Sequence, residues 1–320
     1  MGDGIRYVNL HHHTTFSTGD GHKSPARHVE RAAELGYSAI AFTEHGGVSS
    51  HFQGEAAAIK AGIKPVFGLE AYCGPVDPEH REQYKYHLTI LAEDANGYRN
   101  LNRLVTESWR DYHYHPTVSG ANLRRHSEGL VCLSGCTGSL LACSLVGGKG
   151  IPEPTSRDGY AWDDAGLVIQ RFASLLGSRY YLEVQPFWEL EKTCRINPAY
   201  AKLSRRFNVP LVVTCDVHYP RAEDAEMQAI LHAVHRGKHS VDDVMRAWNY
   251  EVPMTLPASD KELGERLMKT GLTRAEAWEA IVNARYISDS CNVTLPKAER
   301  LRYPIGEEDH EPWGTPRALR

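Results

Sequence analysis

Two pairs of residues in this sequence have the types and the spacing of metal ligands. His11 and His13 follow an apolar segment near the start of the chain, and Asp216 and His218 follow another one 200 residues later. Members of each pair stand two apart, so in an extended backbone both side chains project to the same side and can grip one ion. His12 then points away, into packing or solvent. Imidazole and carboxylate groups suit zinc, manganese or iron(II).

Five more residues of ligand type stand near other short apolar segments. Most of them come at or after the end of a segment, and only His87, in YHLTIL, lies near the start of one. The five are Asp20 in GDG, His45 in TEHG, Glu70 in GLEAY, His87, and Cys136 in SGC. Nine candidates exceed what one tetrahedral or octahedral ion can use, so the set predicts two or three divalent ions.

Each candidate also has an ordinary structural explanation. A single histidine at a strand end is more often a hydrogen-bonded structural residue than a ligand, and a lone Cys136 is more often a small buried side chain. His232, His235 and His239 have ligand-like spacing on a later helix, where an exposed polar face is the better expectation. The metal hypothesis therefore depends on the whole set converging.

Convergence depends on the elements that carry these residues. Short β-branched runs bounded by turn residues predict seven strands, with helical patterns between most of them. Alternating strands and helices favour a parallel sheet, open or closed into a barrel, and in either form a site lies beyond the carboxyl ends of the strands. The strands are expected at Tyr7–Leu10, Ser38–Thr43, Pro65–Tyr72, His87–Leu91, Leu130–Ser134, Tyr180–Val184 and Pro210–Thr214.

After His218 the sequence becomes largely helical. We expect an α/β barrel over residues 1–220, a helical extension over 221–295, and a tail or linker over 296–320. Helices are predicted at Pro25–Leu35, Gly54–Ala61, Tyr98–Tyr112, Ala165–Leu176, Tyr200–Phe207, Ala222–His235, Asp260–Thr270 and Thr273–Cys291.

Composition limits the class of protein. The chain has 36 Lys plus Arg against 40 Asp plus Glu, a net charge of -4, so any contact with nucleic acid must depend on a local basic patch. Its seven cysteines are odd in number and irregularly spaced, which favours a reducing cytoplasm over a disulfide framework. No segment approaches the ~18 apolar residues of a membrane span, so we expect a cytoplasmic protein without a membrane partner.

Six motifs in order resemble the polymerase and histidinol phosphatase (PHP) family. They are LHHHTTFSTGDG, AFTEHGG, GIKPVFGLEAY, YHLTILAEDANGYRNL, LVCLSGCTGSL and VPLVVTCDVHY. The most similar subgroup is the N-terminal PHP domain of bacterial DNA polymerase III alpha subunits, and the likeness covers about 300 of the 320 residues. It implies a distorted (β/α)7 barrel, similar to a TIM barrel.

The resemblance also implies roles for the nine candidates. One ion would be bound by His11, His13, Glu70 and Asp216, and a second by Glu70, His87 and Cys136. A third would be bound by Asp20, His45 and His218. Glu70 and Asp216 would position the ions, while His45 and His218 are candidates to protonate a leaving group. The family places a ligand at His87 whatever the boundary of its strand.

The activity that the resemblance implies is metal-dependent hydrolysis of phosphate esters. Within the polymerase subgroup this is 3′–5′ exonuclease proofreading on DNA 3′ ends, alongside other polymerase subunits or domains. No polymerase palm domain lies within these residues. Two alternatives stay open: a small-molecule phosphomonoesterase of the histidinol phosphatase type, and a non-catalytic module that metals stabilise and that docks to the polymerase.

Overall fold

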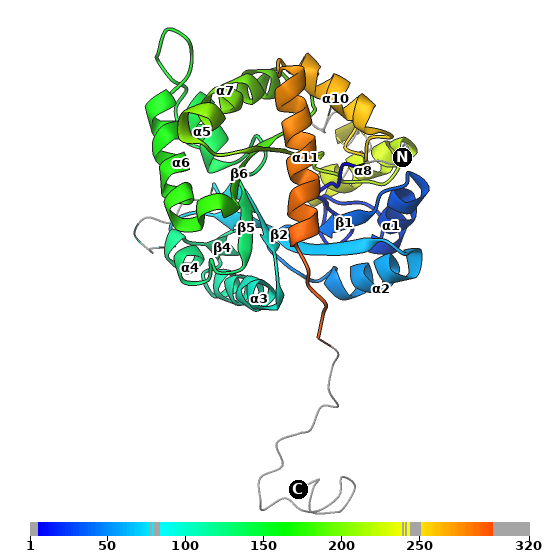
Figure 1. Cartoon of the computed structure of the whole chain (residues 1–320). Helices are drawn as coiled ribbons and strands as arrows, with labels where there is room; N and C mark the ends of the chain where they lie inside the picture. Colours follow the sequence, from blue (N-terminus) through cyan, green and yellow to red (C-terminus); the bar gives the residue numbers. More distant parts are fainter. Residues whose placement is uncertain are drawn as a thin grey trace, which may run out of the picture.

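A curled seven-stranded sheet forms the centre of the molecule, and helices cover its outside (Figure 1). The computed structural model describes residues 6–76, 79, 84–238, 240, 242–243 and 251–296. His239 and residues 297–320 of the predicted tail lie outside this part. Six strands are neighbours in the order β1-β2-β3-β5-β6-β7, and β4 pairs with β2. Their bounds are β1 Ala39–Phe42, β2 Lys64–Cys73, β3 Tyr86–Ala92, β4 Thr117–Val118, β5 Leu130–Leu133, β6 Tyr180–Val184 and β7 Leu211–Val213.

Strand β3 runs against its neighbours, which corrects the expectation of a parallel sheet. It is antiparallel to β2 and to β5, whereas β1 with β2, β5 with β6 and β6 with β7 are parallel. The chain passes from β2 to β3 without an intervening crossover helix, and such a connection joins antiparallel strands. The start of β3, where His87 stands, therefore lies at the same end of the sheet as the carboxyl ends of the parallel strands.

The predicted strand at Tyr7–Leu10 is wrong, although this segment has an equivalent role. Its residues form no regular strand, and the residues just after it close the sheet. On one side Thr43 N–H donates to His12 O (3.1 Å), and on the other Val217 N–H donates to His11 O (3.1 Å). The number of strands is still seven because the structure adds the two-residue β4, which the sequence patterns did not predict. The fold is a distorted α/β barrel of the predicted class.

The helices begin and end largely as local sequence dictates. Asp94 begins α3 by accepting a hydrogen bond from Gly97 N–H, Gly62 ends α2 with a left-handed φ of 71°, and Thr273 with Glu276 forms a capping box. The helices are α1 Pro25–Glu34, α2 His51–Ala61, α3 Ala95–Arg110, α4 Gly120–Arg125, α5 Leu140–Val146, α6 Trp162–Leu176, α7 Glu191–Phe207, α8 Ala225–His235, α10 Asp260–Lys269 and α11 Arg274–Ser290, with short 3₁₀ helices at Gly177–Arg179 and Ala222–Asp224.

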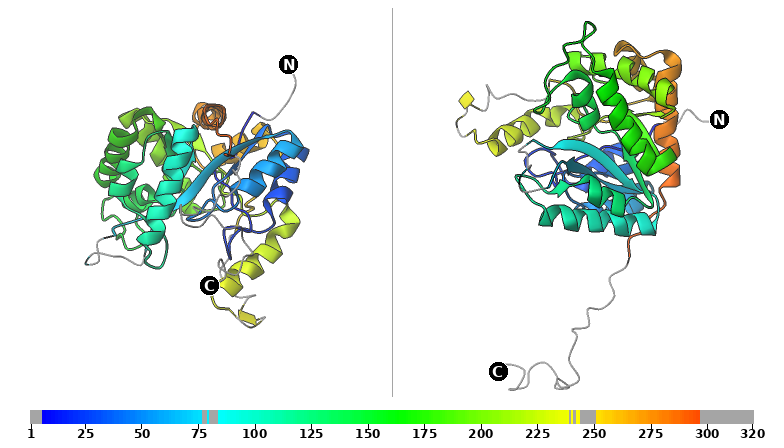
Figure 2. Two further views of the ribbon diagram at one scale, coloured as in Figure 1. Left: turned by 90° about the horizontal axis from the view of Figure 1, so that it is seen from below. Right: turned by 90° about the vertical axis from the view of Figure 1, so that its left-hand side faces the viewer.

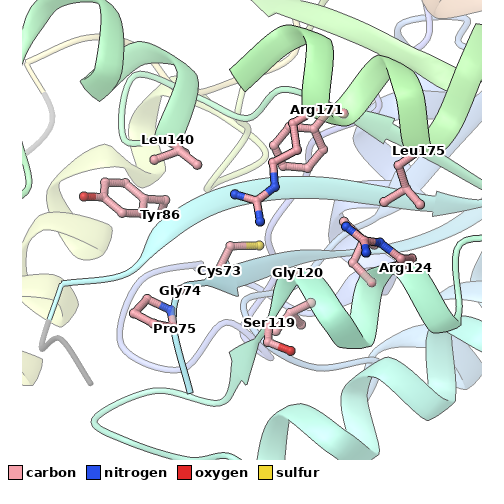
Figure 3. Close-up of a pocket in the computed structure, with 13 residues that line it drawn as sticks. Cys73, Gly74, Pro75, Tyr86, Ser119, Gly120, Arg124, Leu140, Arg171 and Leu175 are labelled. Carbon is pink, nitrogen blue, oxygen red and sulfur yellow. The ribbon is translucent and has the colours of Figure 1, made fainter. Parts of the chain in front are cut away.

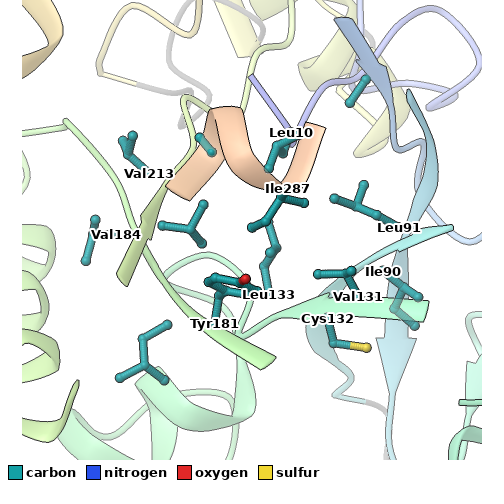
Figure 4. Packing of buried hydrophobic residues seen from close by; sticks show 14 of the residues in the cluster. Leu10, Ile90, Leu91, Val131, Cys132, Leu133, Tyr181, Val184, Val213 and Ile287 are labelled. Atoms are coloured by element: carbon teal, nitrogen blue, oxygen red, sulfur yellow. The ribbon is translucent and has the colours of Figure 1, made fainter. Parts of the chain in front are cut away.

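Helix α11 covers the end of the barrel where the parallel strands begin. Lys64 Nζ donates to Ser288 O (2.7 Å), and Asn283 Nδ2 donates to Leu211 O (2.7 Å), each joining α11 to the start of a strand. Ile287 inserts among the core side chains of several strands (Figure 4). In both views of Figure 2, α8 lies on the side of the molecule opposite α11. Since α11 closes one end of the barrel, a site can form only at the other end, on the side of α8.

None of the helices in the described ranges combines the length and the apolar character needed to cross a bilayer.

Candidate metal centre

Four of the predicted ligands converge at the carboxyl end of the barrel. His11 Nε2 lies 3.3 Å from Glu70 Oε1 and 3.4 Å from Asp216 Oδ1. His13 Nε2 lies 3.4 Å from Glu70 Oε2 and 3.5 Å from the same Asp216 oxygen. Both imidazoles therefore point at one space between two carboxylates, although these residues are far apart in the sequence.

Glu70 connects this group to a second one. Its Oε1 lies 2.7 Å from His87 Nδ1 and 3.7 Å from Cys136 Sγ, and the sulfur lies 3.5 Å from the His87 nitrogen. Its Oε2 lies 2.7 Å from His45 Nδ1. Glu70 is on β2 and is paired with Thr89 of the antiparallel β3, two residues after His87. The reversed strand is thus the reason that His87 reaches Glu70.

A third group surrounds Asp20, on the loop after the first histidines. Asp20 Oδ2 lies 2.8 Å from His45 Nε2 and 3.2 Å from His218 Nε2. His218 Nδ1 donates to Asp216 O (2.8 Å), so its other ring nitrogen faces Asp20. The structure therefore brings all nine predicted residues together in three adjoining groups.

Buried side chains behind the histidines fix their orientation, and Glu183 is the main one that sequence reasoning missed. His11 Nδ1 donates to Glu183 Oε1 (2.7 Å), and the same carboxylate accepts from Thr89 Oγ1 (3.0 Å), Thr214 Oγ1 (2.6 Å) and Gly135 N–H (3.1 Å). A signal was present, because a glutamate inside the otherwise apolar run YYLEV is rarely buried without a partner.

His13 is held in a similar way. Its Nδ1 donates to Ser17 Oγ (2.8 Å), and Ser17 Oγ donates to the buried Glu44 (2.6 Å). In both His11 and His13 the Nδ1 atom carries the proton, which leaves the Nε2 lone pair facing the centre. Metal-binding histidines in proteins are commonly oriented in this way.

The donor set fits divalent cations. His11 Nε2, His13 Nε2, Glu70 Oε2 and Asp216 Oδ1 are all buried and have no hydrogen-bond partner in the described part of the chain. Leaving such atoms unpaired is costly, and a metal ion at their common focus would satisfy them together. The groups His11, His13 and Glu70; Glu70, His87 and Cys136; and His13, His45 and His218 each bring their ligand atoms within 4.8 Å of one another.

The electrostatics of these side chains are dominated by burial and by mutual attraction. Burial opposes the charge of Glu70, but nearby histidines hold the pKa of its carboxyl well below the usual value. Burial likewise disfavours charged His11, yet Asp216, Glu70 and Glu183 raise its pKa well above the usual value. Burial and the adjacent carboxylates raise the pKa of the Cys136 thiol. Bound cations would reinforce the charge of Glu70 and reverse the preferences of His11 and Cys136, because they stabilise carboxylate, neutral imidazole and thiolate.

The site is open on one side. The side chains of His11 and His13 are 0% exposed, whereas those of His45, Asp20 and His87 are 15%, 16% and 20% exposed. A molecule could therefore approach the centre across this side. Asp216 has a φ of 44°, a left-handed conformation that is uncommon for non-glycine residues and that clusters at functional sites.

Helix α8 lies against this side, and its histidines were expected to form an exposed polar face. Gln228 Nε2 donates to Asp20 O (3.0 Å), and His232 is buried with 7% exposure, whereas His235 is exposed. The expectation of an exposed polar face is therefore wrong for His232. His12, by contrast, points away from the centre as expected and packs on His28, with 2.6 Å between His12 Nε2 and His28 Nδ1.

A distorted α/β barrel with clustered histidines, carboxylates and one cysteine at the carboxyl ends of its strands defines a metal-dependent phosphoesterase-like domain. A model of the PHP domain matches residues 9–186, and the chain belongs to this family. The predicted family membership is confirmed.

The similar proteins include DNA polymerase III alpha subunits. The chain is 32% identical over 320 residues to DNA polymerase III subunit alpha of Treponema pallidum, covering 96% of this chain and 25% of the relative. It is 30% identical to that of Thermus aquaticus, covering 95% of this chain and 24% of the relative. The chain thus spans about a quarter of the length of these relatives. A two-domain protein from Bacteroides vulgatus, described as containing a PHP-like metal-dependent phosphoesterase, has 18% identity and a TM-score of 0.43, covering 75% of this chain and 59% of that one.

Proposed function

We propose that this chain binds two or three divalent ions and hydrolyses phosphodiester bonds at DNA 3′ ends, as a 3′–5′ exonuclease. The observation that carries the proposal is the convergence of buried, unpaired nitrogen and oxygen atoms on one space that is open on one side. Zinc, manganese and iron(II) are all compatible with the mixed histidine, carboxylate and thiolate ligands. The similarity to polymerase subunits supports DNA as the substrate.

The residues of the site would have different roles in this reaction. Bound ions at this site would activate a water molecule and neutralise charge on the phosphoryl group. Glu70 and Asp216 would supply the negative charge that holds adjacent cations close together. His45 is part-exposed, and the Asp20 carboxylate 2.8 Å from its Nε2 favours the protonated ring, so this residue would be a candidate to protonate a leaving oxygen when it does not bind an ion. His218, held by the Asp216 carbonyl, is the other candidate for this role.

The test is hydrolysis of a single-stranded and a 3′-recessed oligonucleotide beside p-nitrophenyl phosphate, with manganese or zinc and a chelator control. Stepwise shortening from the 3′ end that the chelator abolishes is expected. Turnover of the monoester alone would overturn the exonuclease proposal in favour of a small-molecule phosphatase. Asp216→Asn is expected to abolish turnover, with circular dichroism to establish that the variant is folded. A folded and fully active variant would refute its assignment as a ligand.

A second candidate function is a metal-stabilised docking module without turnover. The complete burial of His11 and His13 favours it, because ions bound there would supply folding free energy whether or not a substrate reaches them. Three tightly bound ions with no hydrolysis of either substrate would support this function and refute the first.

A further inference from the structure

A pocket outside the barrel, lined in part by neighbours of predicted metal ligands, carries a positive charge. Its volume is about 390 Å3, within the range of about 300–1,000 Å3 that small-ligand pockets occupy. Helices α4 and α6 form its sides, and the ends of β2, β3 and β4 form its floor (Figure 3). Its walls are mainly apolar, with Leu123, Phe172 and Leu175 among them. We call it the arginine pocket.

Two arginines give the pocket its charge. Arg124 comes from α4 and Arg171 from α6, and Figure 3 shows both guanidinium groups at the pocket. No lining residue is acidic, and within the described ranges neither arginine is paired with a carboxylate. Burial raises the pKa of the Cys73 thiol at the floor to about 12 and so keeps this group neutral. The pocket therefore suits a ligand that is apolar in its body and anionic at one end.

The arginine pocket and the metal centre are built from neighbouring residues of the same strands. Its lining residue Tyr86 directly precedes the predicted ligand His87, and Leu140 follows Cys136 by four residues. Cys73 pairs with Tyr86 across the two antiparallel strands, while the adjacent Tyr72 rings contact His45 and His87. Because successive side chains of a strand point to opposite faces, the pocket and the centre lie on the two sides of one sheet edge.

A third cation stands at this edge. Lys149 Nζ donates to Lys85 O (2.8 Å), and a Cβ added to Gly138 would lie 3.0 Å from this nitrogen and 3.7 Å from Cys136 Sγ. Lys149 and Gly150 have φ values of 46° and 85°, as in a type I′ turn, and Tyr86 Oη donates to Lys149 O (3.2 Å). A lysine in a left-handed conformation is unusual, and here the turn directs its ammonium group toward the centre.

From these observations we propose that the arginine pocket binds a nucleotide of a single DNA strand whose 3′ end enters the metal centre. Arg124 and Arg171 contact its phosphate, the apolar walls receive its base, and Lys149 contacts the phosphate between the pocket and the centre. The inference deepens the proposed function, since it rests on that function for the position of the 3′ end. Charge and apolar surface together favour a nucleotide over an inorganic anion.

Binding is tested on the full chain with fluorescein-labelled oligo-dT of eight nucleotides, by anisotropy, in chelator so that no turnover occurs. The double variant Arg124→Met with Arg171→Met is compared with Arg99→Met with Arg110→Met, which removes the same charge from exposed positions on α3. We expect the pocket variant to bind at least tenfold more weakly, and the control to stay within twofold. The slope of log Kd against log salt should fall by about 0.7, since both arginines contact one phosphate and each single-strand phosphate contact contributes about 0.7.

Equal weakening in both double variants, or none in either, would overturn the proposal. So would binding of an acidic, aromatic peptide with the same arginine dependence while oligo-dT does not bind, which would identify a protein partner instead. Lys149→Met provides the second test, because it should raise the KM for oligonucleotide shortening and leave the metal content unchanged. If wild-type protein binds oligo-dT through the arginines but hydrolyses nothing, the proposed function fails while the pocket retains its ligand.

Discussion

Replacing Glu183 by glutamine should loosen the metal centre without touching a predicted ligand. The four groups that surround this carboxylate, His11 Nδ1, Thr89 Oγ1, Thr214 Oγ1 and Gly135 N–H, are all hydrogen-bond donors in the arrangement seen here. Glutamine keeps the shape, but its amide nitrogen is also a donor. At least one partner then faces a donor instead of an acceptor.

The size of the effect follows from two costs. An unsatisfied buried group lowers the free energy of unfolding by about 1–3 kcal/mol. Loss of the carboxylate that orients a metal-binding histidine typically weakens metal binding by about 10–100-fold. The variant Glu183→Gln should therefore show both a lower urea midpoint and faster loss of metal to a chelator. Glu189→Gln is the matched control, because it removes the same charge from an exposed residue.

Metal affinity is measured by competition with a chelating dye, and stability by urea unfolding at pH 7 with the ions removed. A Glu183→Gln protein with the metal affinity and stability of the control would refute the role of this residue. A variant that loses stability but keeps its metal affinity would refute only the inference that Glu183 orients His11 for metal binding.

Three further outcomes are expected. Burial lowers the pKa of His51 to about 4, so the neutral folded form contributes its full stability above pH 6.5 and this contribution is lost as the pH falls toward 4. Between pH 7 and pH 5 the wild-type protein should lose about 2 kcal/mol of unfolding free energy through this residue. His51→Gln should not show this loss in urea unfolding. Ile287→Ala should destabilise the chain by about 2–5 kcal/mol, while Val282→Ala, 43% exposed on the same helix, should change little. Removing the ions should lower the thermal midpoint of wild-type protein, and unchanged midpoints would contradict metal binding.

Local patterns predicted much of the fold. Six of the seven expected strands are present within a few residues of their predicted positions, because each is a short apolar run bounded by turn residues. The first was misassigned because an extended apolar segment looks the same whether or not it has regular ladder partners. Strand β4, with only Thr117 and Val118, is too short for any periodicity to detect.

The direction of β3 was beyond the reach of local patterns. Side-chain alternation is identical in parallel and antiparallel strands, so YHLTIL carries no mark of its orientation. For this reason the position of His87 at the start of its strand had no explanation from the residues alone. The register of β3 against β2 supplies it, since it sets His87 beside Glu70.

The sequence by itself determined the chemical types that gather at this site and the strands that carry most of them, because ligand type and apolar periodicity are local properties. Only the tertiary structure decided how these side chains are shared among three groups, which buried partners orient them, and that His232 is covered rather than exposed. Those features depend on contacts such as His11 with Glu183, 172 residues away. Contacts of this kind are fixed by the packing of the whole barrel and leave no pattern in any one segment.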